Sequence, residues 1–145
     1  MRPEPPLRAD YKVFRPITTR WMDNDVYGHV NNAVYYSFFD TTVSGWLVDQ
    51  GIVDYEHGET IGLAVDSQCS YFAPIQFPEL VTGGMRVDRL GKSSVTYAVG
   101  IFRGDEDHAA AAGTFTHVYV GRETRRPVPL AQDVRTKLQR VLADT

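Results

Sequence analysis

The sequence is poor in cysteine: its 145 residues contain only Cys69, so no intrachain disulfide can form. A lone cysteine is typical of a reducing compartment, and we expect a cytoplasmic protein. No stretch approaches the ~20 apolar residues that a membrane-spanning helix needs. Residues 1–10 carry three prolines and four charges in place of the apolar segment of a signal peptide. We therefore expect a flexible tail at residues 1–10, one domain at residues 11–145 and no membrane partner.

An excess of one charge sign is also lacking. The chain has 15 Lys and Arg against 18 Asp and Glu, a net charge of -3, and both signs are interspersed. This pattern argues against a nucleic-acid surface. The chain's histidines lack the spacing of metal ligands; they are His29, His57, His108 and His117. We therefore expect neither a nucleic-acid partner nor a metal site.

The most informative segment that is present is a polar loop at residues 23–32, which reads Asp-Asn-Asp-Val-Tyr-Gly-His-Val-Asn-Asn. It gathers two carboxylates, an imidazole and carboxamides directly before an apolar run at residues 33–39. A single Asp or Asn would suffice as the N-cap of a helix, and Asn31 or Asn32 suits that role. The surplus of polar groups beside a buried helix suits a general base or a nucleophile instead, although a purely structural loop is the alternative.

Hydrophobic periodicity predicts the other elements. A strand is expected at residues 11–19, with Pro16 indicating an edge or a bulge. A long helix at residues 32–50 is apolar around most of its circumference, so we expect it to be enclosed. Period-2 alternation predicts four strands, at residues 61–71, 81–88, 94–101 and 114–119, before a short helix at residues 130–142. This order predicts an α+β fold, in which one antiparallel β-sheet wraps around one long central helix.

The element order and the polar loop resemble the hotdog-fold thioesterases, most closely the 4-hydroxybenzoyl-CoA thioesterase-like acyl-CoA hydrolases. In that family the first strand ends in Asp-x-Asp-x-x-Gly before the buried helix, which residues 23–28 match. The continuation through residues 29–32 is also similar to the loop of plant acyl-ACP thioesterases. Weaker similarities occur at residues 71–80, 90–95 and 116–118. The resemblance implies an acyl-CoA thioesterase without a cofactor, which works as a homodimer or homotetramer with its site at the interface.

The resemblance places the catalytic carboxylate at Asp25, as nucleophile or as general base. It places the oxyanion donors at the backbone N–H groups of Asn31 and Asn32, where a helix start leaves amides free. Asp23 is expected to be structural. His29 has no counterpart in the 4-hydroxybenzoyl-CoA enzymes, so we expect it to be catalytic, to orient Asp25 or only to brace the loop.

A CoA thioester carries phosphate charges, so an acidic chain must bind it through local basic residues. The candidates for binding substrate or CoA are Arg89, Lys92, Ser93, Arg122, Arg125, Arg126 and Tyr71. We expect His117 to be a core histidine and Cys69 a small buried hydrophobe. Two other functions remain open, a hotdog hydratase or dehydratase acting on acyl-ACP or acyl-CoA and a non-catalytic acyl-CoA-binding module. The sequence does not indicate the acyl group.

Overall fold

One antiparallel sheet of five strands forms the frame of the protein in the computed structural model, which describes residues 3–144. The strands are β1 (Val13–Thr18), β2 (Thr60–Tyr71), β3 (Leu80–Leu90), β4 (Ser94–Arg103) and β5 (Ala111–Gly121). Their order across the sheet is β1-β3-β4-β5-β2, and every neighbouring pair is antiparallel. The strands predicted from alternation are therefore confirmed.

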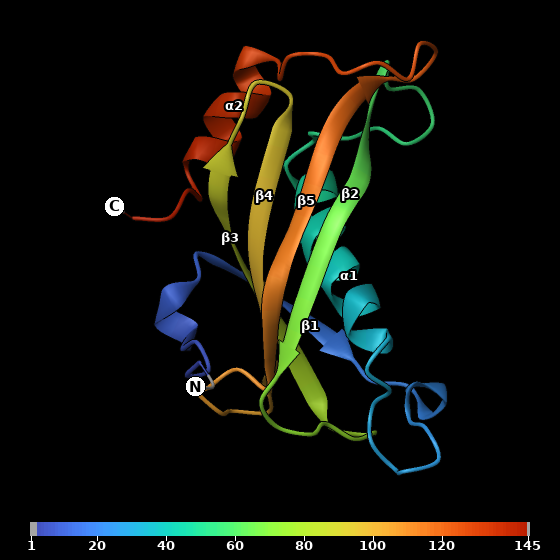
Figure 1. Ribbon diagram of the computed structural model, residues 1–145, viewed down its shortest axis with the longest axis vertical. Helices are drawn as coiled ribbons and strands as arrows, with labels where there is room; N and C mark the ends of the chain where they lie inside the picture. The colour runs from blue at the N-terminus through green and yellow to red at the C-terminus, as the bar shows by residue number, and fades with distance from the viewer. Residues whose placement is uncertain (1–2, 145) are drawn as a thin grey trace.

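The long helix α1 (Val34–Asp49) packs against one face of this sheet, as predicted (Figure 1). Its side chains Phe39 and Val43 are fully buried in the main apolar cluster. Each such side chain contributes about 1.5–3 kcal/mol through burial. On the facing strand β3, a Cβ atom at Gly83 would overlap the Thr42 hydroxyl of α1. Glycine at this position therefore lets the helix approach the sheet closely.

The remaining helices are short. Two 3-10 helices, η1 (Arg8–Asp10) and η2 (Trp21–Asp23), flank β1, and the predicted C-terminal helix is observed as α2 (Gln132–Gln139). No helix within residues 3–144 is long and apolar enough to cross a membrane.

The N-terminal segment differs from the expectation of a flexible tail over residues 1–10. Residues 1–2 lie outside the described residues. The Arg8 guanidinium donates hydrogen bonds to the carbonyl oxygens of Gly104 and Glu106, each at 2.8 Å. These partners belong to the β4–β5 connection, far along the chain, so the local composition could not reveal them. The expectation of an unattached tail is corrected for this part of the segment.

The sheet has two edges, which β1 and β2 form. Pro16 lies in β1, which confirms the predicted edge position. Within residues 3–144, β2 pairs only with β5, so one side of its backbone has no strand beside it. β2 also exposes apolar side chains, with Leu63 37% and Val65 58% accessible. A long apolar edge strand of this kind is a site where another chain can pair.

Candidate active site

The polar loop is anchored at its start by the buried carboxylate of Asp23, whose side chain is 1% exposed. One oxygen, Oδ2, accepts the Arg20 backbone N–H at 2.7 Å. The other, Oδ1, accepts the Arg20 guanidinium at 3.0 and 3.2 Å. The Asp23 carbonyl oxygen also accepts the Asn31 N–H at 2.9 Å, which closes the loop. Asp23 therefore has the structural role that the sequence predicted.

Asp25 lies inside this closed loop and is half-buried. Its backbone N–H donates to the His29 carbonyl at 2.9 Å. Its carboxylate oxygen Oδ1 accepts the Tyr27 N–H at 2.9 Å, and Oδ2 accepts the Asn31 side-chain amide at 3.3 Å. Each carboxylate oxygen can accept two hydrogen bonds, so both keep a free lone pair. Asp25 is thus held in place and can still act on a substrate or a water molecule.

The far side of the polar loop is bonded to the connection between β2 and β3. The Val30 N–H donates to the Ile75 carbonyl at 2.7 Å, and the Asn24 side-chain oxygen accepts the Phe77 N–H at 3.1 Å. Val30 is buried, with 5% of its surface accessible. Sequence reasoning missed Asn24, because its partner is distant in the chain and no local pattern marks it.

The start of α1 corrects one prediction about the oxyanion donors. The Asn31 N–H donates to the Asp23 carbonyl, so it is not free to bind an oxyanion. The Asn31 side-chain oxygen accepts the Ala33 N–H at 2.9 Å. The N-cap of α1 is Ala33, without a side-chain cap, so neither Asn31 nor Asn32 is the N-cap that was predicted. The Asn32 N–H makes no hydrogen bond within residues 3–144 and is the candidate donor that remains. Its position at the positive end of the helix dipole favours an anion.

A cavity of about 310 Å³ lies beside the helix start. Its walls include His29, Asn32, Tyr35 and Tyr71. The Tyr71 hydroxyl donates to the Asn32 carbonyl at 2.8 Å, and its ring meets the Tyr35 ring at 5.1 Å between centroids. Burial raises the pKa of Tyr35 to about 12 and also raises the pKa of Tyr71. Both hydroxyls therefore stay protonated near neutral pH, and Tyr71 fixes the helix start while it lines the cavity.

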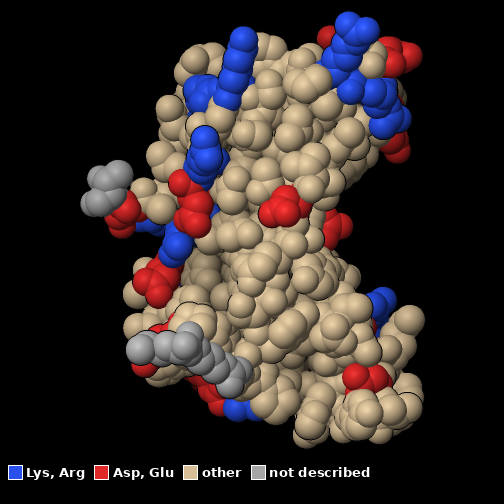
Figure 2. Space-filling model, in the orientation of Figure 1, with Lys and Arg blue, Asp and Glu red and all other residues tan. Residues whose placement is uncertain are grey.

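The candidate cations lie at the opposite end of the sheet from the polar loop. Arg89 and Lys92 are at the β3–β4 turn, and Arg125 and Arg126 follow β5 (Figure 1). Figure 2 shows Lys and Arg side chains gathered at this upper end. β5 has 11 residues, so its ends lie about 33 Å apart. One chain therefore does not bring these cations beside Asp25.

Arg122 has a different role from the one expected. Its guanidinium donates to the backbone carbonyls of Gly58 at 2.5 Å and Tyr55 at 2.8 Å. Its backbone N–H donates to the Glu59 carbonyl at 2.7 Å. Arg122 thus fastens the segment between α1 and β2 to the end of β5 through its Nε and Nη2 atoms. Ser93 lies in the β3–β4 turn, where its backbone carbonyl accepts the Tyr119 N–H at 2.8 Å.

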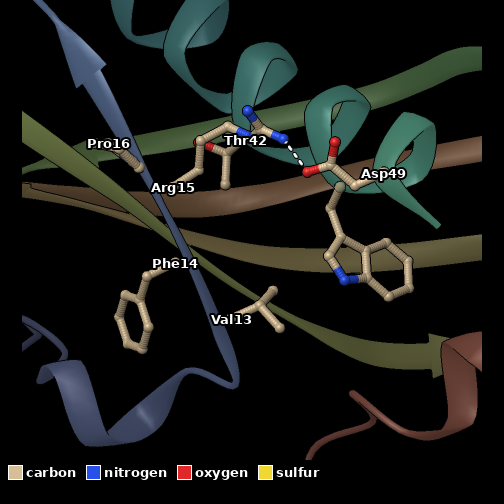
Figure 3. A pocket seen from close by; sticks show the side chains of 7 residues that line it. Val13, Phe14, Arg15, Pro16, Thr42 and Asp49 are labelled. Carbon is tan, nitrogen blue, oxygen red and sulfur yellow. Dashed lines mark hydrogen bonds and ion pairs between the residues drawn. The ribbon is translucent and has the colours of Figure 1, made fainter.

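Another pocket, of about 210 Å³, lies at the β1 edge (Figure 3). An ion pair between Arg15 of β1 and Asp49 of α1 crosses it, and the apolar side chains of Val13 and Phe14 project from β1 nearby. It contains none of the predicted site residues. The Asp49 carboxylate forms an ion pair with Arg15, so this pocket lacks a carboxylate that is available as a general base. We therefore do not place the reaction there.

The other titratable candidates offer no nucleophile or metal site. Cys69 is half-buried and burial raises the pKa of its thiol, so the thiolate that a nucleophile needs is disfavoured. His117 is buried on β5, where the sequence predicted it. No three His, Cys, Asp or Glu side chains within residues 3–144 gather closely enough to hold a metal ion.

The model of the Thioesterase superfamily matches residues 27–110, which is more than half of the chain. The chain belongs to the thioesterase superfamily. Among solved structures of this superfamily's fold, PA5185 from Pseudomonas aeruginosa is 49% identical, with a TM-score of 0.94 over 97% of this chain and 99% of that chain. PA2801, a putative thioesterase from Pseudomonas aeruginosa, is 28% identical, with a TM-score of 0.79 over 86% and 96% of the two chains.

More distant similarity confirms the hotdog fold of this superfamily member. Slr0204, a 1,4-dihydroxy-2-naphthoyl-CoA thioesterase from Synechocystis, is 16% identical, with a TM-score of 0.79 over 87% of this chain and 94% of that chain. At this identity the similarity shows the fold alone. The predicted thioesterase family and the predicted fold are both confirmed.

Proposed function

We propose that this protein is a cytoplasmic acyl-CoA thioesterase that hydrolyses an acyl- or aroyl-CoA thioester to the free acid and CoA. The observation that carries the proposal is the arrangement of Asp25 and Asn32 around Asn31. The Asn31 side chain holds the Asp25 carboxylate and the Ala33 N–H at once, and so ties the carboxylate to the helix start. A base and a free amide in one rigid segment are the groups that acyl transfer to water requires.

The chemistry follows from these groups. Asp25 either removes a proton from the attacking water or attacks the thioester carbonyl itself. The carbonyl oxygen becomes negatively charged and is stabilised by the Asn32 N–H and the helix dipole. The C–S bond then breaks, and the CoA thiolate leaves. Where Asp25 itself attacked the carbonyl, water then hydrolyses the acyl–Asp25 anhydride, which releases the free acid and restores the carboxylate. His29, which lines the adjacent cavity, is exposed and can contact substrate or accept a proton there.

The direct test of the activity is thiol release from a panel of aryl, short-chain and long-chain acyl-CoAs. A thioesterase releases free thiol and acid in equal amounts. Formation of an enoyl product without thiol release would identify a hydratase or dehydratase. Recovery of every acyl-CoA intact in its bound form would identify a binding module, and either result would contradict the proposed function.

The separation between Asp25 and the basic residues supports a homodimer that pairs through β2. The polar loop lies near Tyr71, at the end of β2, whereas Arg122 and the cations that follow it lie near Thr60, at its start. If β2 pairs antiparallel with its copy, the Tyr71 end of one protomer meets the Thr60 end of its partner. Figure 2 shows the molecule narrowing at mid-height on the side of β2 and α1. Each site then contains one protomer's Asp25 and its partner's cations.

A charge at the centre of β2 is expected to weaken this dimer. In Val65→Lys, the two introduced ammonium groups would lie beside the symmetry axis and repel one another. The dimer dissociation constant should rise roughly tenfold or more, with activity lost as protein is diluted. Sedimentation at several concentrations measures the dissociation constant. Leu80→Lys is the matched control, because Leu80 is 66% exposed on another strand. An unchanged dimer in Val65→Lys would rule out the β2 interface.

Removing a cation that contacts CoA phosphates is expected to raise KM with little change in kcat, because remote contacts bind ground and transition states alike. For Lys92→Ala or Arg126→Ala, we expect KM to be roughly tenfold to hundredfold higher than in the wild type. This difference from the wild type should become smaller at high salt. Initial rates on full-length substrate and on a truncated thioester without the nucleotide give the comparison. Arg140→Ala, at an exposed residue after α2, is the control. Equal losses on both substrates would contradict a CoA contact.

A further inference from the structure

The peptide group between Asn32 and Ala33 is held at both ends by side chains. Its carbonyl oxygen, which belongs to Asn32, accepts the Tyr71 hydroxyl at 2.8 Å. Its N–H, which belongs to Ala33, donates to the Asn31 side-chain oxygen at 2.9 Å. In the preceding peptide group, the Asn31 carbonyl accepts the Val34 N–H at 2.9 Å, whereas the Asn32 N–H makes no hydrogen bond within residues 3–144. An open donor thus lies between groups that are fixed.

The direction of this open donor depends on a short turn at residues 31–34. Peptide groups are planar, so fixing the peptide between Asn32 and Ala33 restricts the rotation of Asn32 and of its own N–H. The Asn31 side chain that holds the Ala33 N–H belongs to the turn itself. The Tyr71 bond is the one hydrogen bond within residues 3–144 that joins this turn to a strand of the sheet. It therefore links the direction of the donor to the frame of the protein.

Tyr71 is itself held in a fixed position. It is the last residue of β2, where it pairs with Ala111 of β5. Its ring stands at 85° to the ring of Tyr35, which is buried in the main apolar cluster. Burial raises the pKa of Tyr71, so its hydroxyl keeps its proton near neutral pH. A phenol has one proton to donate, and this one is donated to the Asn32 carbonyl.

We propose that Tyr71 is a positioning residue for thioester hydrolysis: its hydroxyl, acting through the Asn32 carbonyl, directs the Asn32 N–H at the oxygen of the thioester carbonyl. The inference rests on the proposed function, in which this N–H stabilises the oxyanion. Such a donor must lie about 2.7–3.1 Å from the oxygen that becomes charged, and a displacement of ~1 Å can cost about a hundredfold in rate. A hydroxyl that only holds the donor can therefore have a large effect on turnover.

Tyr71→Phe tests the proposal, because it keeps the ring and removes only the hydroxyl. We expect kcat to fall roughly tenfold, less than the 10²–10³-fold loss of deleting an oxyanion donor outright. KM should stay within about twofold of the wild type, because the oxyanion exists only in the transition state. Unchanged kcat would overturn the proposal, since water would then replace the hydroxyl at the Asn32 carbonyl. A higher KM with unchanged kcat would overturn it as well, because the hydroxyl would then bind substrate.

Tyr36→Phe is the matched control. Tyr36 lies in the first turn of α1, its ring packs against Phe39, and its hydroxyl makes no hydrogen bond within residues 3–144. This variant makes the same chemical change near the same helix start and should keep the wild-type kcat. An equal loss of kcat in Tyr36→Phe would show that the effect is not specific to the Asn32 carbonyl, and the proposal would fail.

A double-mutant cycle with Asn32→Pro tests whether Tyr71 acts through the Asn32 N–H. Proline lacks this N–H and suits the second position of a four-residue turn, which Asn32 occupies. Asn32→Pro should lower kcat about 10²–10³-fold. In this background, Tyr71→Phe should cost less than about twofold more, because the donor that it directs is already absent. A second tenfold loss would show that Tyr71 acts elsewhere and would overturn the proposal.

A spectroscopic test does not depend on the proline variant. The probe is whichever of benzoyl-CoA and hexanoyl-CoA is hydrolysed faster, labelled with ¹³C at its carbonyl and bound to the Asp25→Asn protein. A hydrogen bond polarises a carbonyl and lowers its stretching frequency, which infrared difference spectra measure. Adding Tyr71→Phe should move the bound carbonyl band back toward its frequency in solution. An unmoved band would overturn the proposal, even if the variant were less stable.

The failures of the two proposals are distinguishable. If no acyl-CoA releases thiol, the proposed function is wrong. If Asn32→Pro folds, as thermal unfolding would show, and keeps the wild-type kcat, the Asn32 N–H is not the oxyanion donor. If Asn32→Pro loses activity but Tyr71→Phe does not, the proposed function stands and only the positioning role of Tyr71 is refuted.

Discussion

Asp25→Asn is expected to lower kcat on the best substrate about 10²–10⁴-fold, because it removes the general base or nucleophile. The side-chain oxygen of asparagine can still accept the Tyr27 N–H that Asp25 accepts at 2.9 Å, so the loop should keep its conformation. Steady-state thiol release measures the loss. Thermal unfolding of the same variant should match that of the wild type.

The control for this variant is Asp105→Asn, in the exposed turn between β4 and β5. It makes the same chemical change far from the helix start and should leave turnover unchanged. Wild-type turnover in Asp25→Asn would show that another group activates the water, and the assignment of Asp25 would then be wrong. His29 would be the next residue to substitute, since it lines the cavity beside the helix start.

Asp23→Ala is expected to lower the free energy of unfolding by about 2–4 kcal/mol. The buried carboxylate accepts both the backbone N–H and the guanidinium of Arg20, and its removal takes away the acceptor of both groups. The loop should then lose its closed shape, so turnover should fall as well. Urea unfolding at a fixed protein concentration measures the stability change, because a dimer's stability depends on concentration.

The conservative variant Asp23→Asn distinguishes the loss of the hydrogen-bond acceptor from the loss of the negative charge. It keeps one oxygen that can accept the Arg20 N–H, so its stability loss should be smaller than that of Asp23→Ala. If Asp23→Ala were as stable as the wild type, the anchoring role of this carboxylate would be refuted. Together with Asp25→Asn, the series separates a carboxylate that holds the loop from one that acts on the substrate.

The sequence was sufficient to predict the five strands and the two α-helices, because the spacing of apolar residues that marks each of them lies within the element itself. Alternation marked the strands, and the apolar circumference of residues 32–50 marked a helix that the sheet encloses. The polar loop was recognisable for a related reason, because its surplus of polar side chains directly precedes a buried segment. The family resemblance added the expected role of Asp25, which periodicity alone cannot assign and which stays a prediction.

The sequence was insufficient wherever a group's partner is distant in the chain. The Asn31 N–H was expected to be free, but the turn of the loop brings it to the Asp23 carbonyl. Arg122 was expected at a phosphate, but the packing of β2 beside β5 gives it the carbonyls of Gly58 and Tyr55.

The polar loop and the basic residues lie at opposite ends of the sheet, so substitutions can accumulate separately in the two regions. The polar loop and the β3–β4 turn share no hydrogen bond among residues 3–144, so a substitution in one does not disturb the other. With the proposed roles of Lys92 in binding the carrier and of Asp25 in hydrolysis, recognition of the carrier can therefore change at Lys92 while the chemistry at Asp25 stays the same. The same lineage can then exchange one thiol carrier for another by altering surface residues alone.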